Sequence, residues 1–283
     1  MILPDIEAVV RIVAETAAEE VMPRFAKLAR ADITEKRPGD IVTVADVAAE
    51  QRLTARLSAL VPGSLVVGEE SVAADAGVLA RLAGDDPVWV IDPIDGTANY
   101  AAGIPIFAVM VAFVRGGRTL AGWIHDPVAA STAVAVSGEG AWMAGSGARL
   151  HVAPAELPES MSGAVALRYG NRRLVRRIAG RSNLVGSVFS FRCAGHEYLA
   201  LASGRAHFAL YQRLMPWDHA PGQLIHKEAG GFSAQLDCSP YSPRVHDGGL
   251  LLAPDEASWN ELHAVLIGGE NREPNTRTVA TAR

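Results

Sequence analysis

The stretch from Phe107 to Trp142 is the feature that most restricts the fold, because three β-type runs follow one another there with only short breaks. The runs are FAVMVAFV, TLAGWIHD and STAVAVS. The breaks are RGGR, an Asp-Pro turn at 126–127, and GEG, and connections this short join antiparallel neighbours. This stretch therefore predicts an antiparallel meander.

Helical patterns flank the meander. Before it, apolar residues recur at helical spacing over residues 4–30 and 44–61, and SLVVGEES predicts a short strand that leaves into an acidic turn. After about residue 150, strands and helices alternate. The predicted strands are GAVAL, HFALY and GGLLLAP, and the predicted helices are NRRLVRRIAG, CAGHEYLALASG, PGQLIHKEAGG and residues 255–266. We expect layered sheets and helices in two coupled halves, 1–150 and 151–268, followed by a flexible tail, 269–283.

The composition is that of an ordinary globular protein of 283 residues, with 49% hydrophobic residues and a net charge of −5. The negative charge argues against nucleic acid as a partner, and the arginines at 172, 173, 176 and 177 fit the solvated face of a helix. Two cysteines, Cys193 and Cys238, favour a reducing compartment. The first residues form an amphipathic pattern rather than a signal peptide, and no apolar run would span a bilayer. We expect a cytoplasmic protein with no membrane partner.

The segment WVIDPIDGTANY, residues 89–100, places two carboxylates three residues apart. Trp89 begins a buried strand end, Asp92 closes that strand, and Pro93 stops its hydrogen-bond ladder because proline has no N–H. One interpretation is a plain Asp-Gly turn in which Asp95 hydrogen-bonds its own backbone. The segment alone does not decide between this turn and a binding site.

Further acids lie where other elements end. GEES at 68–71 places Glu69 beside Glu70, and WDHAPG at 217–222 places Asp218 before a helix. DIVTVAD at 40–46 adds Asp40, Thr43 and Asp46. Each has a structural alternative. Asp218 would serve as a helix N-cap, and Thr43 or Asp46 would cap the helix that follows.

Taken together, these acids predict a shared site for a hard divalent cation. Mg²⁺ takes oxygen ligands from one or two carboxylates together with water and phosphate. Asp92 and Asp95 can face one point from two sides, with the Ile94 carbonyl between them, and the N–H groups of Gly96 and Thr97 can meet a phosphate. The Thr97 hydroxyl can hold an attacking water. The sequence has no zinc-type or P-loop motif.

The chain resembles the inositol monophosphatase family, the Mg²⁺-dependent, lithium-sensitive phosphatases that share their fold with fructose-1,6-bisphosphatase. GEES, WVIDPIDGTANY, WDHAPG and EAGG at 228–231 carry the resemblance in the family's order, over roughly residues 5–265. It implies an α-β-α-β-α sandwich, an active site between the two halves, two to three Mg²⁺ ions and a homodimer.

The resemblance also implies roles for individual residues. Glu69, Asp92, the Ile94 carbonyl and Thr97 would surround the first metal and the nucleophilic water, with Glu69 as its base. Asp92, Asp95 and Asp218 would hold the second metal, and Asp46 would touch a third through water. Gly96 and Thr97 would contact the phosphate. Lys36 is the nearest candidate for the lysine that the family places before its D-[IL]-V-T segment.

Two departures from the family pattern bear on the substrate. Ala98 stands where the family usually has threonine, which leaves the metal ligands intact. Tyr211 stands where inositol-specific members carry an acid, Arg213 follows it, and SFRCAGHEY, which contains Arg192, also departs from the common small-residue pattern. These three residues are the expected substrate contacts. We expect a substrate with an additional anionic group, because a guanidinium suits a carboxylate or a second phosphate.

The predicted function is hydrolysis of a small phosphorylated metabolite by metal-activated water. Alternatives within this class are fructose-1,6-bisphosphatase, histidinol-phosphate phosphatase and 3',5'-bisphosphate nucleotidase activity. A different class, a regulatory or binding protein that keeps the fold without catalysis, is disfavoured because every metal ligand implied by the resemblance is present.

Overall fold

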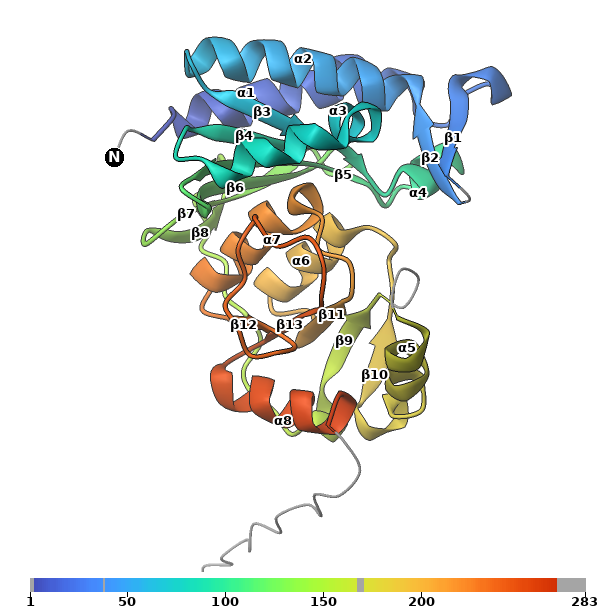
Figure 1. Cartoon of the computed structure of the whole chain (residues 1–283), viewed down its shortest axis with the longest axis vertical. Coiled ribbons are helices and arrows are strands. Elements are labelled where there is room, and N and C mark those ends of the chain that lie inside the picture. The colour runs from blue at the N-terminus through green and yellow to red at the C-terminus, as the bar shows by residue number, and fades with distance from the viewer. Residues whose placement is uncertain (1–2, 38, 167–170, 269–283) are drawn as a thin grey trace, which may run out of the picture.

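The computed structural model describes residues 3–37, 39–166 and 171–268, and its elements stack in five alternating layers (Figure 1). Helices α1 (Ile6–Thr16) and α2 (Val44–Leu60) cover one face of a six-stranded sheet. Helices α6 (Ala194–Ala202) and α7 (Pro216–Glu228) lie between this sheet and a five-stranded sheet, whose outer face carries α5 (Arg172–Ala179) and α8 (Glu256–Leu266). The expected α-β-α-β-α sandwich is therefore confirmed.

The six-stranded sheet runs in the order β3-β4-β5-β6-β7-β8. Its strands are β3 (Leu65–Gly68), β4 (Val88–Asp95), β5 (Ala108–Arg115), β6 (Arg118–Asp126), β7 (Ser131–Val136) and β8 (Gly140–Met143). Strands β3 and β4 are parallel, and every later neighbour is antiparallel. The predicted meander is confirmed. Its short turns place each strand antiparallel beside the next one in the chain.

The five-stranded sheet has the order β10-β9-β11-β13-β12. Its strands are β9 (Ser162–Val165), β10 (Ser187–Phe189), β11 (Phe208–Tyr211), β12 (Phe232–Gln235) and β13 (Leu250–Ala253). A small hairpin, β1 (Ile33–Arg37) and β2 (Asp40–Thr43), lies outside both sheets at the end near α4 (Thr97–Ala101) (Figure 1). The division at residue 150 stays a prediction.

The helical pattern predicted over residues 4–30 ends earlier than expected. Helix α1 stops at Thr16, a π-helical turn (Ala17–Val21) and a 3₁₀ turn (Met22–Arg24) follow, and the chain is extended at Phe25. Pro23 within that last turn cannot donate a helical hydrogen bond, and Ala26 has a φ of +56°. Phe25 and Leu28, the apolar residues after these turns, therefore pack against the core from irregular backbone rather than from a helix.

Helix α7 lies against the six-stranded sheet at backbone distance. A Cβ at Gly122 of β6 would lie 2.9 Å from both the Cα and the carbonyl oxygen of Pro221. On the other side, a Cβ at Gly222 would lie 2.1 Å from a ring carbon of Tyr198 in α6. Glycine at both positions removes the side chain that would hold these elements apart.

The basic cluster lies on α5, on the outer face of the five-stranded sheet (Figure 1). Arg172, Arg173 and Arg176 are exposed, as a solvated helix face requires. Arg177 differs, because it is half-buried and donates to the Ile267 carbonyl at 3.0 Å. Among the described residues, no helix is long and apolar enough to cross a membrane.

Candidate active site

Strand β4 carries both carboxylates of the segment WVIDPIDGTANY, but it does not end at Asp92 as expected. It continues to Asp95, which pairs with Ala108 of β5, and the register shifts between Asp92 and Asp95. Proline can occupy a strand where the ladder is already interrupted, and Pro93 lies in this irregular part. The Asp92 carboxylate accepts the Ile94 N–H at 3.1 Å.

Among the hydrogen bonds of the described residues, the Asp95 carboxylate has partners at the start of α6 and none on its own backbone, so the plain turn interpretation is wrong. Its Oδ2 accepts the Gly195 N–H at 2.5 Å and the Cys193 thiol at 3.1 Å. Gly96 then turns the chain with a φ of +86°, a left-handed conformation that glycine adopts without strain, and α4 begins at Thr97. Asp95 is thus fixed by the N-terminal end of α6 (Ala194–Ala202), which lies about 100 residues later in the chain.

Asp218 completes a cluster of three carboxylates. It lies inside the first turn of α7, whose N-cap is Met215, so the N-cap alternative for Asp218 is wrong. One ligand oxygen each from Asp92, Asp95 and Asp218 lies within 4.8 Å of the others. Segments more than a hundred residues apart therefore place three acidic oxygens around one point.

The electrostatics of this cluster fit a divalent cation. Burial raises the pKa of Asp92 well above its ordinary value, and the charges of Glu69, Asp95, Asp218 and Asp46 raise it further. Burial and the charges of Asp95 and Glu69 likewise raise the pKa of Asp218. Acids held together at this cost are typical of a site whose charge is neutralised by a bound ion, and an all-oxygen donor set suits Mg²⁺.

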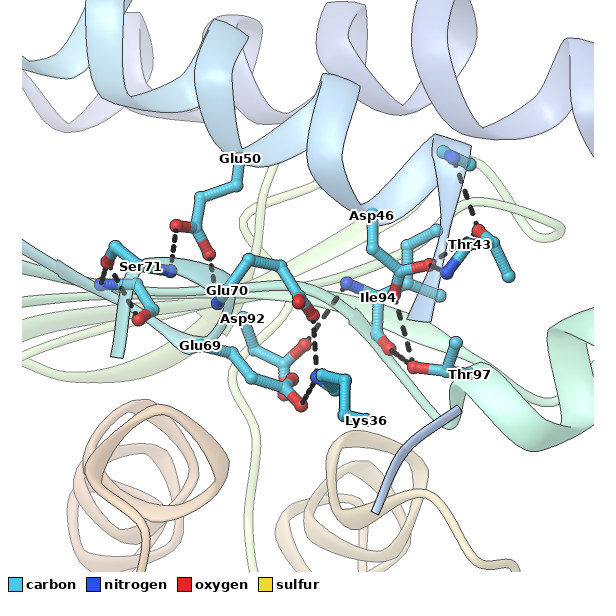
Figure 2. A network of polar contacts seen from close by, with 12 residues as sticks. Lys36, Thr43, Asp46, Glu50, Glu69, Glu70, Ser71, Asp92, Ile94 and Thr97 are labelled. Atoms are coloured by element: carbon cyan, nitrogen blue, oxygen red, sulfur yellow. Dashed lines mark hydrogen bonds and ion pairs between the residues drawn. The ribbon is translucent and has the colours of Figure 1, made fainter. Parts of the chain in front are cut away.

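Glu69 lies beside the cluster, where Lys36 contacts it (Figure 2). The Lys36 ammonium lies 2.9 Å from Glu69 and 2.8 Å from Glu70, and these contacts keep its pKa raised despite burial. Burial raises the pKa of Glu69, and Lys36 opposes that effect. Lys36 of β1 therefore lies beside both glutamates, and its correspondence to the family's lysine stays a prediction.

Glu50 of α2 holds the segment that carries Glu69 (Figure 2). Its carboxylate accepts the N–H groups of Glu70 at 2.7 Å and Ser71 at 2.8 Å, the first donors of α3 (Glu69–Ala74). A Cβ at Gly68 would lie 2.3 Å from the Glu50 carboxyl carbon. Sequence reasoning missed Glu50 because its position within an amphipathic helix looks like an exposed one.

Asp46 of α2 is hydrogen-bonded to Thr97, the first residue of α4 (Figure 2). The Thr97 hydroxyl lies 3.1 Å from Asp46 Oδ1 and 2.9 Å from the Ile94 carbonyl. The second oxygen of Asp46 accepts the N–H of Thr43 at 2.8 Å, and Thr43 is the N-cap of α2. The capping role expected for Thr43 is confirmed, and burial raises the pKa of Asp46 to about 7.

The three clustered carboxylates line one cavity of about 410 Å³, together with Glu69, Ile94, Gly96 and Thr97. Its wall also contains the three expected substrate contacts and several residues that sequence reasoning did not single out. The expected contacts are Arg192, Tyr211 and Arg213. The additional residues include Ser190, Glu197 and Gln212. Glu197 had one signal in the sequence, an acid within the apolar pattern of CAGHEYLALASG.

The inositol monophosphatase family model matches residues 4–269. The chain belongs to this family. Its members are phosphoric monoester hydrolases, and the acidic cluster agrees with a metal-dependent member. The match spans both sheets and every residue of the cavity named above.

Individual relatives support this membership. The fructose-1,6-bisphosphatase/inositol-1-monophosphatase of Thermotoga maritima is 31% identical over 205 residues, which cover 71% of this chain and 75% of the relative. The inositol-1-monophosphatase of Mesorhizobium japonicum is 33% identical over 219 residues, covering 75% and 79%. The crystal structure of the extragenic suppressor protein suhB from Bartonella henselae superimposes with a TM-score of 0.79 at 23% identity, covering 93% and 98%. This last likeness establishes the fold.

Proposed function

We propose that this chain is a Mg²⁺-dependent phosphomonoesterase that hydrolyses a small phosphorylated metabolite. The convergence of Asp92, Asp95 and Asp218 within 4.8 Å carries the proposal. These three carboxylates, with Glu69 and the Ile94 carbonyl, would hold two ions, and Asp46 would reach a third through water. Bound Mg²⁺ would supply Lewis-acid activation of water and would neutralise charge on the phosphate oxygens.

The residues around the cluster would orient the attacking water. The Thr97 hydroxyl has one proton, which it donates to Asp46 or to the Ile94 carbonyl, so its lone pairs remain to accept a hydrogen bond from water. Glu69 would take the proton that the water loses, and Lys36 opposes the rise that burial causes in the pKa of Glu69. The N–H groups of Gly96 and Thr97, at the start of α4, would contact the phosphate.

The alcohol part of the substrate would contact Tyr211, Arg213 and Arg192. A buried tyrosine at position 211 offers no full negative charge to sugar hydroxyls, and burial raises its pKa well above the ordinary value. We infer a substrate with a second anionic group near Arg213. Fructose 1,6-bisphosphate and adenosine 3',5'-bisphosphate fit this class, whereas histidinol phosphate and inositol monophosphate do not. The T. maritima relative is named for both fructose-1,6-bisphosphatase and inositol-1-monophosphatase activity.

Phosphate release from a panel of esters tests this function. The panel is p-nitrophenyl phosphate, inositol 1-phosphate, histidinol phosphate, fructose 1,6-bisphosphate and adenosine 3',5'-bisphosphate, each with Mg²⁺ and with excess chelator. We expect turnover that chelator abolishes and that Asp218→Asn lowers, whereas Asp85→Asn, an exposed control, retains it. No turnover of any ester would support the alternative, a regulatory protein with this fold.

Arg213→Ala tests the substrate class. Its KM for the preferred bisphosphate should rise more than its KM for p-nitrophenyl phosphate, since only the bisphosphate carries the second anion. Equal changes for both esters, or inositol 1-phosphate as the best substrate by a wide margin, would leave only the general phosphatase proposal.

Three further properties are expected from the family resemblance and extend the proposal. A homodimer should be detected by light scattering of the purified protein. Li⁺ should inhibit turnover in competition with Mg²⁺, because a small cation can enter an all-oxygen site. The protein should fractionate with the cytoplasm of its cell.

A further inference from the structure

The turn at residues 190–193, between β10 and α6, forms part of the cavity wall and is held from two sides. Glu197 Oε1 accepts the Phe191 N–H at 2.9 Å and the Ser190 hydroxyl at 3.2 Å. Asn99 of α4 donates its side-chain amide to the Phe191 carbonyl at 2.8 Å. Both peptide groups of Phe191 are therefore fixed by side chains that are themselves buried.

Arg192, the next residue, has a backbone that needs such support. Its φ is +55°, in the left-handed region that residues with a Cβ rarely adopt, and its N–H donates to the Ser190 hydroxyl at 3.2 Å. Arg192 is exposed and lines the cavity. A backbone conformation of this kind persists only where the surroundings impose it, and such residues are typical of ligand-binding sites.

Glu197 could instead contact the substrate directly, since it also lines the cavity. Its geometry argues against direct contact. Only 2% of Glu197 is exposed, and one of its oxygens already accepts two hydrogen bonds. The ring of Tyr211 is also buried beside it, and the charge of Glu197 contributes to the raised pKa of Tyr211. The Glu197 carboxylate is occupied by the protein itself, whereas Arg192 is an exposed residue.

We propose that Glu197 is a positioning residue for substrate selection, which holds Arg192 in the left-handed conformation from which its guanidinium binds the second anionic group of the substrate. This inference rests on the proposed phosphatase function, and it adds a residue and a role that the metal cluster does not require. The cleaved phosphate would lie at Asp92, Asp95 and Asp218. The second anion, a phosphate or a carboxylate, would meet Arg192 elsewhere in the same cavity, together with Arg213.

Two matched pairs of esters isolate the second anion. They are fructose 1,6-bisphosphate against fructose 1-phosphate, and adenosine 3',5'-bisphosphate against adenosine 3'-phosphate. The measured quantity is the ratio of kcat/KM within a pair, at saturating Mg²⁺. We expect a ratio of roughly 10 or more in at least one pair, since a hydrogen bond to a charged group contributes a factor of about 10 to 100.

Variants of the two residues then test whether Glu197 acts through Arg192. Arg192→Ala and Glu197→Ala should each lower the ratio by about tenfold, and the double variant should lower it no further, because residues that act as one unit are not additive. Glu197→Gln, which keeps an acceptor for the Phe191 N–H, should restore the ratio to within about threefold of wild type. Arg11→Ala, an exposed arginine on α1, is the control for loss of charge and should leave the ratio unchanged.

Stability is measured in parallel, because Glu197→Ala empties a buried position. If that variant unfolds, Glu197→Asp replaces it, since its shorter side chain withdraws the acceptor with less loss of volume. Ratios near 1 in both wild-type pairs would overturn the inference and leave the phosphatase proposal intact. Additive losses in the double variant, or equal losses for both members of a pair, would also overturn it. No hydrolysis of any of the four esters would overturn the phosphatase proposal and this inference with it.

Discussion

The Thr97 hydroxyl lies 3.1 Å from the carboxylate of Asp46, which precedes it by 51 residues. The same hydroxyl lies 2.9 Å from the Ile94 carbonyl, and it makes no contact with a helix N–H among those described. Thr97 is the first residue of α4, whose N-cap is Gly96. The arrangement is that of an oriented hydroxyl rather than a helix cap.

Thr97→Ala should therefore affect rate far more than stability. We expect a fall in kcat of roughly 10²-fold or more, from loss of water orientation, and a change of about 1 kcal/mol or less in the free energy of unfolding. Thr97→Ser is the matched control, because it keeps the hydroxyl and should retain most of the rate. Urea unfolding and kcat measured on the same preparations decide the point, and a large stability loss with little change in kcat would contradict it.

Asp92→Asn should lower the activity of the enzyme but raise the stability of the metal-free protein. The amide keeps an oxygen for the Ile94 N–H but removes one charge from the buried cluster. We expect kcat/KM to fall on the order of 10³-fold, since several kcal/mol depend on metal-assisted catalysis. In chelator, Tm should rise, because burial and the neighbouring carboxylates disfavour the charge that the variant lacks.

Calorimetric titration with Mg²⁺ supplies a readout of Asp92→Asn that does not depend on turnover. Binding should weaken in this variant and stay unchanged in Asp85→Asn, whose side chain is exposed. An unchanged affinity of Asp92→Asn for Mg²⁺ would show that Asp92 is not a metal ligand.

Gly68→Ala should damage the site through Glu50. The new Cβ would lie 2.3 Å from the Glu50 carboxyl carbon, so Glu50 must leave the N–H groups of Glu70 and Ser71. We expect a loss of about 1 to 3 kcal/mol in the free energy of unfolding, together with a lower kcat as Glu69 loses its support. Gly63→Ala is the control, since its position is open although its φ is positive. An equal effect of the two substitutions on kcat would contradict the role of Glu50.

Glu197 should make the stability of the metal-free protein depend on pH. Burial raises its pKa from 4.5 to about 7, so between these values the folded state binds more protons than the unfolded state. The contribution of Glu197 to stability is therefore complete below pH 4.5 and is lost as pH rises through 7. Glu197→Gln should flatten the decline in this window by up to about 3 kcal/mol. Urea unfolding in chelator across the window measures it, with Glu7→Gln as an exposed control.

Sequence patterns predicted the parts of this molecule that depend on near neighbours. The meander followed from its short turns, and the acids of D-P-x-D-G-T, together with Asp218, followed from the order of two motifs. The partners of Asp95 did not follow, because Cys193 lies 98 residues away and Gly195 lies 100. Contacts at such separations are decided by packing of α6 against the sheet, which no local pattern encodes.

The same limit explains the errors at element ends. Pro93 indicates a strand end on local grounds, yet pairing with β5 resumes at Asp95 because the neighbouring strand is already in place. Asp218 has the residue type of an N-cap, yet Met215 occupies that position because Pro216 starts the helix. In both cases tertiary context overrode a local preference.

The direct contact of β6 with α7 at Gly122 and Pro221 has a consequence for evolution and engineering of this scaffold. Because no side chain separates the two elements, α7 cannot shift or rotate independently, and Asp218 travels with the sheet that carries Asp92 and Asp95. The three carboxylates therefore keep fixed positions relative to one another. Arg192 reaches the cavity from the turn at residues 190–193 and not from α7 or the sheet. Under its proposed role, changes to this one side chain would alter substrate preference without replacing any of the three carboxylates.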